Sequence, residues 1–435
     1  MNAMEPTDET KHPLEIAYLQ GLFQGLSETF VIREVIALQK MDFNVSVFAL
    51  KREKSHLLEK SLSGEETSKR CIYARPDHTI QHIWINVKSL FRHPLRYLKT
   101  LWPFLKEAKY VEPPVFARLI YHFFSGIGFA GEVHRRGIRH IHAHFSSGTH
   151  MALTIHRFTG VPFSFTAHAS SDIFDKPVML DEKLRRAAFV VAVCDYSKKY
   201  LDAVTGYRYS DKIHRIYNGI DPAEARSLLG DLGAKGLLTR RHPKRVRIVS
   251  VGRLIGCKGF ATLIGACRIL KERGHRFSCR IVGDGPQRKA LEKLINKQGL
   301  AHTVEITGYL PLHGIYRALA EADIFSLLSE IHINGFRDGF PTVILEAMTM
   351  SLPVVSTWIS GIPEMVLDGR TGLLVHERDE ESAANAIEDL IVNEEKRIEF
   401  GRSGRQRVMT RFHLEQSMTQ LSERFRQSTR GRDHV

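Results

Sequence analysis

Short apolar runs alternate with amphipathic stretches along most of the chain, and this alternation is its main structural signal. Residues 14–20 (LEIAYLQ) predict a strand, the stretch after them predicts a helix through Leu38, and residues 44–50 (NVSVFAL) predict a second strand. Strand, helix and strand in this order are typical of a βαβ unit. Further short strands are predicted at 138–145, 161–169, 188–194 and 212–218.

The alternation stops after Asp221 and restarts further along the chain. The segment DLGAKGLLTRRHPKR is rich in Gly and Arg, and strands return at 246–252 and 278–283, followed by VEITG, ADIFSLL and PVVST. We therefore predict an α/β fold of two doubly wound domains. The predicted boundaries are 1–221 for the first domain, 222–245 for a connector, 246–404 for the second domain, and 405–435 for a tail with a helix that packs back toward the first domain.

Ligands of open parallel sheets bind at the carboxyl ends of the strands, and two facing domains would form a cleft there. The candidate residues at predicted strand ends are Gly21, Gly25, His144, His168, Arg253, Gly283, Gly308 and Asp338.

The segment DGFPTVILEAMTM (338–350) places two acids around the start of a predicted apolar helix. Pro341 suits a first helical turn, so Asp338 precedes the helix and Glu346 lies inside it. A helix N-terminus attracts anions, and nearby carboxylates accept hydrogen bonds from hydroxyls. A ligand that fits both features would carry phosphate groups and hydroxyl groups, and a nucleotide sugar carries both. The alternative is structural, with Asp338 as a cap and Glu346 paired with a nearby Arg.

A second loop, GRLIGCKGF (252–260), carries Arg253 and Lys258 around a glycine after a predicted strand. Two cations and free backbone N–H groups suit a diphosphate. The loop lacks the GxxxxGK[ST] pattern, and a solvated surface loop remains the alternative.

Composition sets broad limits on the partners and the compartment. The 435 residues are 43% hydrophobic and 25% charged, with a formal net charge of +14, which favours an acidic partner such as nucleic acid, an anionic membrane or a phosphorylated substrate. The five Cys are scattered, which suits a reducing compartment. The polar N-terminus does not resemble a signal peptide, and no apolar run reaches the length of a membrane span. We expect a cytoplasmic protein.

The run HIHAHF (140–145) raises the question of a metal, because His140, His142 and His144 alternate along one strand face. A strand covered by helices would bury these imidazoles, where neutral His is satisfied by hydrogen bonds. The chain has neither HExxH nor a D-x-D pair. We expect no metal and no cofactor.

Residues 88–109 form a basic amphipathic stretch. Apolar residues recur at helical spacing beside a row of cations, with Pro94 expected to start a helix and Pro103 to kink or end it. The apolar residues are Phe91, Leu95, Leu98, Trp102 and Leu105, and the cations are Lys88, Arg92, Arg96 and Lys99. Such a pattern suits an anionic membrane surface. The alternative is a helix whose aromatic stripe packs into the domain core.

Together these motifs resemble retaining glycosyltransferases of family 4 with the GT-B architecture, of the bacterial type that builds exopolysaccharide, colanic acid or lipopolysaccharide. The matching segments are LSETFVIREVIALQ, residues 142–174, IYNGID, VGRLIGCKGF, IVGDGPQR, ITGYLP and DGFPTVILEAMTMSLPVVSTWISGIPEMVLDGRTGLLV. The resemblance implies a UDP- or GDP-sugar donor, a lipid-linked or polysaccharide acceptor, and no nucleic-acid partner. With residues 88–109 as the membrane contact, the expected location is the cytoplasm, with peripheral attachment to the inner face of the cytoplasmic membrane.

The resemblance also implies roles for individual residues. Arg253 and Lys258 would clamp the donor diphosphate, Asp338 would bind sugar hydroxyls as the first acid of an E-x7-E motif, and Glu346 would hold the ribose. Glu330, eight positions before Asp338, is an alternative first acid. The remaining residues implied in donor binding are His168, Gly25, Gly283, Tyr309, Leu310, Gly339, Phe340 and Thr342.

The sequence offers no carboxylate pair of the kind that glycosidases place around an anomeric carbon. The resemblance implies front-face attack with retention, in which cations and the helix dipole stabilise the departing diphosphate. Two other functions remain open: a nucleotide-sugar epimerase, and a catalytically silent scaffold at a membrane surface.

Overall fold

The computed structural model describes residues 13–23, 29–52, 71–75, 79–168, 172–174, 177–230 and 245–430. Gly25 lies outside the described residues, as do Ser27 and Glu28 beside it.

The first domain is built on a parallel sheet of seven strands, in the order β3-β2-β1-β4-β5-β6-β7. Its strands are β1 (Leu14–Phe23), β2 (Phe43–Arg52), β3 (Cys71–Arg75), β4 (His140–His144), β5 (Phe163–Ala167), β6 (Val190–Ala192) and β7 (Ile213–Arg215). Its helices are α1 (Thr29–Gln39), α3 (Thr79–Arg92), α4 (Pro94–Lys106), the 3-10 turn η1 (Glu107–Lys109), α5 (Pro113–Arg135), α6 (Phe145–Thr159), α7 (Leu180–Arg186) and α8 (Asp195–Val204).

The second domain is built on a parallel sheet of six strands, in the order β10-β9-β8-β11-β12-β13. Its strands are β8 (Val246–Val251), β9 (Phe277–Val282), β10 (Val304–Gly308), β11 (Ile324–Leu327), β12 (Val354–Thr357) and β13 (Gly372–Val375). The helices from the joint onward are α9 (Pro222–Leu229), η3 (Gly256–Lys258), α11 (Phe260–Glu272), α12 (Arg288–Lys297), α13 (Leu312–Glu321), α14 (Thr342–Thr349), α15 (Ile362–Met365), α16 (Glu380–Val392), α17 (Glu394–Arg411) and α18 (Leu414–Thr429).

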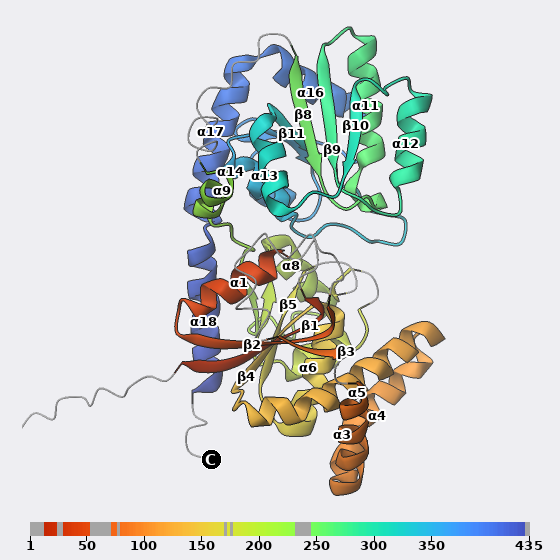
Figure 1. The fold of residues 1–435 in the computed structure, drawn as a ribbon, viewed down its shortest axis with the longest axis vertical. Helices are drawn as coiled ribbons and strands as arrows, with labels where there is room; N and C mark the ends of the chain where they lie inside the picture. Colours follow the sequence, from red (N-terminus) through yellow and green to blue (C-terminus); the bar gives the residue numbers. More distant parts are fainter. Residues whose placement is uncertain are drawn as a thin grey trace, which may run out of the picture.

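The prediction of two doubly wound α/β domains is confirmed (Figure 1). Strands β3 and β13 were not predicted, and residues 222–229 of the predicted connector form helix α9. Asp221 caps α9, because its side chain accepts a hydrogen bond from the N–H of Ala223 at 2.8 Å. Pro222 occupies the first helical position, which suits its fixed φ.

The chain crosses between the domains twice. It crosses first before α9, and α17 then leads back from the second domain into α18 (Figure 1). Helix α18 packs on α1, where Met418, Leu421 and Phe425 are buried in one apolar cluster with residues of β1 and β2. Backbone hydrogen bonds of Ile220 to Phe412 and Leu414 join the two crossings. The two domains are therefore tied at the joint by backbone as well as by side chains.

Helices α3 and α4, with the beginning of α5, project from the first domain at the lower right of Figure 1. We call α3 and α4 the helical arm. The alternative in which its aromatic stripe packs into the core is wrong, because the stripe faces solvent: Phe91 is 79% exposed, Leu95 74% and Trp102 58%. Exposed apolar residues continue along α3, namely Ile80, Ile83, Trp84, Val87 and Leu90.

The two prolines of α4 have different effects. Pro94 is the first residue of the helix, as predicted, but Pro103 lies inside it and the helix continues to Lys106. Because Pro103 lacks an N–H, the carbonyl of Lys99 has no helical donor. The Nη2 of Arg157, at the end of α6, donates to that carbonyl at 2.7 Å instead, and this bond anchors the arm to the domain.

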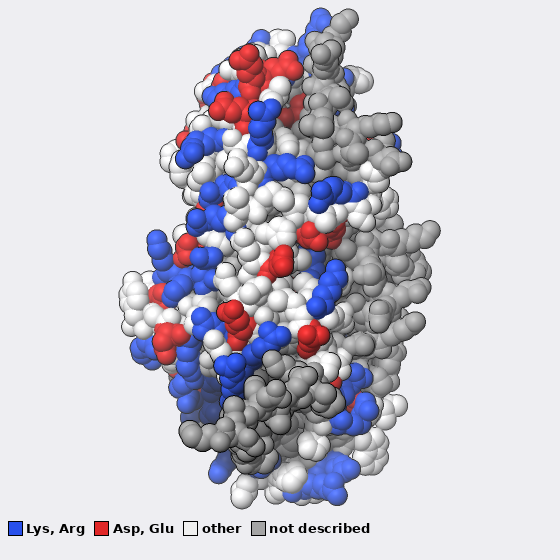
Figure 2. Space-filling view, turned by 90° about the vertical axis from the view of Figure 1, so that its left-hand side faces the viewer, with Lys and Arg blue, Asp and Glu red and all other residues white. Residues whose placement is uncertain are grey.

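Basic and acidic side chains are intermixed on the face that carries α17 and α18 (Figure 2). The net charge of +14 is therefore not gathered into one continuous patch there. Within the described residues, no helix combines the length and apolarity needed to cross a membrane.

Candidate active site

The strand ends of the two sheets meet at the domain interface. Cys194, just after β6, directs its thiol at the carbonyl of Gly339, just before α14, at 3.7 Å. Two backbone N–H groups at the start of α8 donate to Glu364 of the second domain at 2.8 Å. The ring of Tyr217 stacks on that of Phe340. The edge that carries the predicted candidate residues is therefore also the edge where the domains touch.

Lys258 and Asp338 form an ion pair at this edge of the second domain. The Nζ of Lys258 donates to Oδ1 of Asp338 at 2.8 Å, and the hydroxyl of Ser329 donates to Oδ2 at 2.7 Å. The two charged side chains are only 14% and 15% exposed. The sequence predicted both residues, and the structure brings them together.

Gly259 explains how Lys258 reaches this position. Its φ is +64°, and a Cβ there would lie 1.7 Å from the carbonyl oxygen of Leu328. Only glycine tolerates both the left-handed backbone and this close approach. The loop after β8 can therefore press against the end of β11, where Ser329 and Asp338 are within reach of the ammonium group.

Arg253 is the second predicted cation of this loop. Its side chain is exposed and makes no hydrogen bond or ion pair with any residue that the structure describes. The loop thus presents one cation held by a carboxylate and one that is available to an incoming anion.

Glu346 pairs with an arginine, as the structural alternative anticipated, but the partner comes from the other domain. Arg33 of α1 donates from Nη1 and Nη2 to Oε1 of Glu346, both at 3.0 Å. Its Nε donates to Glu224 of α9 at 2.8 Å, and Tyr316 of α13 also contacts Glu224. Arg33 and Glu346 are 4% and 5% exposed.

Burial and the neighbouring charges shift the pKa values of Glu346 and Arg33 in opposite directions. Burial raises the pKa of Glu346, Arg33 lowers it, and the negative charge of Glu224 raises it again. Burial alone would lower the pKa of Arg33, but Tyr316, Glu346 and Glu224 raise it above its usual value. The guanidinium is therefore charged and shared between two acids. No described residue donates to Oε2 of Glu346.

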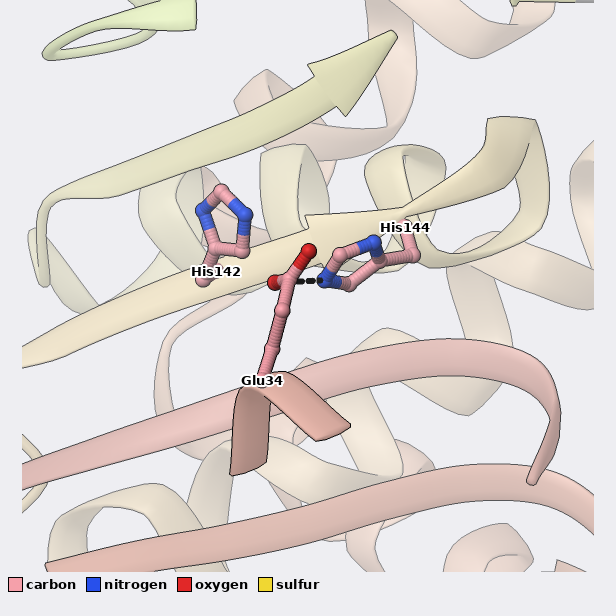
Figure 3. A group of neighbouring side chains, drawn as sticks. All are labelled: Glu34, His142 and His144. Atoms are coloured by element: carbon pink, nitrogen blue, oxygen red, sulfur yellow. Dashed lines mark ion pairs between the residues drawn. The ribbon is translucent and has the colours of Figure 1, made fainter. Parts of the chain in front are cut away.

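His168, at the end of β5, is held by a chain of buried polar groups. Its Nε2 lies 2.9 Å from Nδ1 of His144. The Nε2 of His144 in turn lies 3.5 Å from Oε2 of Glu34, and Figure 3 shows this second contact. Tyr18 donates to the same carboxyl oxygen at 3.2 Å. Glu34 directly follows Arg33 on α1. The same helix therefore contacts Glu346 through Arg33 and the histidine chain through Glu34.

Burial governs the protonation of this chain. It lowers the pKa of His168 to about 3 and that of His144 well below its usual value, and it raises the pKa of Glu34 to about 8. Near neutral pH both imidazoles are therefore uncharged, and Glu34 is mostly protonated. His168 is therefore a neutral hydrogen-bonding group rather than a cation.

Glu34, His142 and His144 could in principle hold a metal ion, since one ligand atom from each lies within 4.8 Å of the others (Figure 3). Ser164 and Thr166 engage both ring nitrogens of His142, and Ser164 also contacts His140. Nε2 of His144 is buried without a hydrogen bond and lies 3.5 Å from Oε2 of Glu34. Two of the three candidate ligands, His142 and Glu34, thus already have hydrogen-bond partners.

The other described residues that were predicted to bind the donor lie in the second domain. Gly283 follows β9, and a Cβ there would lie 1.9 Å from the carbonyl of Gly252, which brings the two loops into close contact. Tyr309 and Leu310 follow β10, and both are half-buried. Gly339, Phe340 and Thr342 lead into the N-terminus of α14.

Glu330, the alternative first acid, has a different environment from Asp338. Its nearest cation is Arg378 at 3.5 Å. Asp338 contacts Lys258 and immediately precedes α14. Of the two acids, Asp338 is therefore the one that lies beside Lys258 at the start of α14.

Sequence reasoning missed Arg33 and Glu364. Arg33 and Glu34 interrupt the otherwise apolar run FVIREVIAL of α1, and two charges inside an apolar helix are a signal for buried pairing. Their partners, however, are distant in sequence. Glu364 stands in a short helix with no distinctive pattern, and its role in joining the domains could not be inferred.

Two family models match the chain. Residues 27–224 match Glycosyltransferase Family 4, and residues 239–407 match Glycosyl transferases group 1. The first range holds strands β2 to β7 of the first sheet, and the second range holds all six strands of the second sheet.

Curated relatives include bacterial polysaccharide enzymes. The chain is 40% identical over 157 residues to the putative colanic acid biosynthesis glycosyltransferase WcaL of Escherichia coli K12, covering 34% of this chain and 39% of WcaL. It is 35% identical over 214 residues to the amylovoran biosynthesis glycosyltransferase AmsK of Erwinia amylovora, covering 49% and 50%. The matches thus span half or less of these relatives.

A solved structure extends the similarity to the whole fold. Anabaena HepE in complex with UDP and glucose aligns with a TM-score of 0.70 at 17% identity, covering 95% of this chain and 100% of HepE. The fold is therefore GT-B, as the resemblance implied.

Proposed function

We propose that the protein transfers a sugar from a nucleoside diphosphate to a lipid-linked or polysaccharide acceptor during bacterial surface polysaccharide synthesis. The premise is that residues 27–224 match Glycosyltransferase Family 4 and residues 239–407 match Glycosyl transferases group 1. The observation that carries the proposal is the Lys258–Asp338 pair at the N-terminus of α14, with Arg253 on the same loop as Lys258.

The diphosphate is the ligand that this arrangement fits best. In the structure Lys258 is compensated by a carboxylate at 2.8 Å. A diphosphate would attract the ammonium group of Lys258 and the free guanidinium of Arg253, and the N-terminus of α14 would add its dipole. Asp338, released from part of its contact with Lys258, could then accept hydrogen bonds from the donor sugar.

Glu346 is proposed to hold the ribose through Oε2, while Arg33 fixes the carboxylate through Oε1. A charge-assisted hydrogen bond of this kind contributes about 1.5–3 kcal/mol. Because Arg33 belongs to the first domain, the ribose contact would depend on the domains being closed. His168, neutral and backed by His144, would supply a hydrogen bond to the donor sugar.

We propose a retaining, metal-independent reaction. Lys258, Arg253 and the helix dipole would stabilise the negative charge that develops on the departing diphosphate, and the leaving phosphate would accept the proton of the acceptor hydroxyl. Fixed cations that face a leaving group can substitute for a divalent ion in this role.

We also propose that the helical arm docks the first domain on an anionic membrane leaflet, where a lipid-linked acceptor would be found. The support is the exposed apolar stripe of α3 and α4 beside the exposed cations Lys88, Arg92, Arg96 and Lys99. Aromatic and aliphatic side chains enter the interfacial region of a bilayer, and neighbouring cations attract anionic headgroups.

The test is release of nucleoside diphosphate from a panel of UDP- and GDP-sugars, with and without a lipid-linked acceptor, in buffer containing excess EDTA. A transferase releases nucleoside diphosphate in an acceptor-dependent manner, and we expect EDTA to leave the rate unchanged. An epimerase would change the sugar without release. A silent scaffold would do neither, and either outcome would overturn the proposal.

A further inference from the structure

A basic cavity of about 370 Å³ lies where the helical arm joins the first domain. Leu95, Arg96, Lys99 and Thr100 of α4 line one side, and the other side is formed by Arg157 and Arg186, near the ends of α6 and α7. Four of these six lining residues are cations. Nothing in the proposed transfer reaction uses them.

The charge of this cavity is not balanced by the described residues around it. The acid that pairs with the cavity's arginines is Glu182, which contacts Arg157 at 2.6 Å, Arg186 at 2.5 Å and also Arg185 outside the cavity. One carboxylate thus serves three guanidinium groups, while Arg96 and Lys99 have no acidic partner among the described residues. Burial lowers the pKa of Arg157, and the nearby charge of Arg186 lowers it further.

Hydrogen-bond donors in the cavity are also left unused. The Nε of Arg157 is buried without an acceptor, although the two Nη groups of the same residue are engaged. The side chain of Lys99 is exposed and donates to no described residue. A buried donor without an acceptor costs free energy, so an anion that accepts from these groups would bind favourably.

The cavity is separate from the candidate active site. Helix α6 begins at Phe145, next to His144, and runs for 15 residues before it ends beside the cavity. At 1.5 Å per residue this helix is about 22 Å long. The donor diphosphate at the domain interface therefore lies too far away to occupy the cavity.

Apolar side chains lie next to these cations. Leu95 lines the cavity and also belongs to the exposed apolar stripe, with Leu98 and Trp102 further along α4. A ligand that spans both surfaces would need an anionic group joined to an apolar chain. We propose that the cavity binds the phosphate of an anionic phospholipid headgroup while the acyl region lies against the stripe of the arm.

This inference deepens the proposed membrane docking, because it assigns a specific headgroup site, and it does not depend on glycosyl transfer. Non-specific attraction falls off within about a Debye length of the membrane, so it would weaken equally for any two exposed cations of the arm that are removed. A headgroup site instead requires that the cavity cations matter more than the other exposed cations of the arm.

The experiment uses the full chain and vesicles of phosphatidylcholine containing phosphatidylglycerol, at physiological salt. The test variant is Arg96→Gln with Lys99→Gln, both exposed, so folding is not at risk. The matched control is Lys88→Gln with Arg92→Gln, two exposed cations of α3 that do not line the cavity, with the same loss of charge. We expect the test variant to bind about tenfold or more weakly than this control.

Soluble probes separate a lipid headgroup from free phosphate. Dihexanoyl phosphatidylglycerol, below its micelle concentration, should raise the melting temperature of the wild type but not of the test variant, and inorganic phosphate should have a smaller effect. If both double variants bind the vesicles equally weakly, the loss of charge alone explains the result and the proposed headgroup site is wrong. An equal response to inorganic phosphate would assign the cavity to free phosphate and overturn the lipid assignment.

A separate assay distinguishes the headgroup site from the proposed glycosyl transfer. It measures acceptor-dependent release of nucleoside diphosphate with a short-chain acceptor in the absence of vesicles. The test variant should retain that release, since its substitutions lie outside the candidate active site. If the test variant loses both the release of nucleoside diphosphate and the binding of lipid, the headgroup site is not separate from the active site.

Discussion

Charged side chains are buried and paired at the domain interface, whereas on the helical arm they are exposed. At the interface, charged side chains are buried and paired: Arg33 is 4% exposed and bonds two acids, and Lys258 contacts Asp338. On the arm, Arg92, Arg96 and Lys99 are exposed beside large apolar side chains that also face solvent. Buried pairs can exchange one partner for a ligand, whereas exposed, unpaired cations attract a partner from outside the protein.

This contrast implies that the two regions can be disabled separately. Changes at the interface should reduce turnover and leave vesicle binding intact, while changes on the arm should do the reverse. Each prediction below tests one side of that separation.

The largest effect is expected for Lys258→Ala. The substitution removes a cation that would stabilise the departing diphosphate, and loss of one such electrostatic contact lowers kcat by about 100- to 1000-fold. Vesicle binding should be unchanged, because Lys258 lies in the second domain. Steady-state kinetics and vesicle sedimentation measure the two effects, with Lys289→Ala as the control. Turnover within about threefold of the wild type would remove Lys258 from the reaction.

On the arm, replacement of Arg92, Arg96 and Lys99 by Glu should weaken binding to anionic vesicles by at least about a hundredfold, since each cation near such a surface contributes about 1 kcal/mol. Binding should also weaken as salt rises. The melting temperature should change little, because all three side chains are exposed. If the wild type does not sediment with anionic vesicles even at low salt, membrane docking is wrong.

Glu346→Gln tests the ribose contact with a smaller change than alanine would make. Alanine would leave Arg33 with Glu224 as its one acidic partner in a buried site, so a loss of stability would obscure the kinetics. Glutamine keeps an acceptor for Arg33 but removes the charge. We expect kcat/KM to fall about ten- to a hundredfold.

The matched control is Glu399→Gln, an exposed acid of α17, which should behave as the wild type. Unchanged kinetics in a folded Glu346→Gln variant would limit Glu346 to joining the domains.

The smallest effect is a pH dependence of stability that arises from Glu34. Burial raises the pKa of Glu34 in the folded protein from about 4.5 to about 8. The folded state therefore retains a proton that the unfolded chain has lost, and this contribution to stability decreases as pH rises from about 5 through 8. Glu34→Gln should remove it.

The comparison is made by melting both proteins across this range. The melting temperature of the wild type minus that of the variant should fall by about 2 °C or more as pH rises from 5 to 8. A difference that is constant with pH, or one that rises with it, would mean that Glu34 is not protonated in the folded protein.

Local patterns in the sequence predicted much of this molecule. Alternation of apolar runs and amphipathic stretches was sufficient for both sheets, because a parallel strand covered on both faces is apolar along its length. The loop of Arg253 and Lys258 and the acid Asp338 could be placed at strand ends for the same reason. Strand β3 (CIYAR) was missed because it is short and contains a charge.

Two features could not be predicted from local patterns. The Arg33–Glu346 contact joins residues 313 positions apart, and no periodicity links them. The arm presents the opposite difficulty, since an apolar stripe at helical spacing appears the same in sequence whether it faces a core or solvent. Only the packing of α4, which buries Tyr97, Thr100 and Phe104 and leaves the stripe outside, distinguishes the two.

The most direct test of the central claim is calorimetric titration of UDP and of GDP into the wild type and into Lys258→Ala, without vesicles. The account predicts that the wild type binds one of the two, and that Lys258→Ala binds it about tenfold or more weakly while Lys289→Ala binds as the wild type does. Failure of the wild type to bind either nucleotide, or equal binding by Lys258→Ala, would contradict a nucleoside diphosphate site at the domain interface.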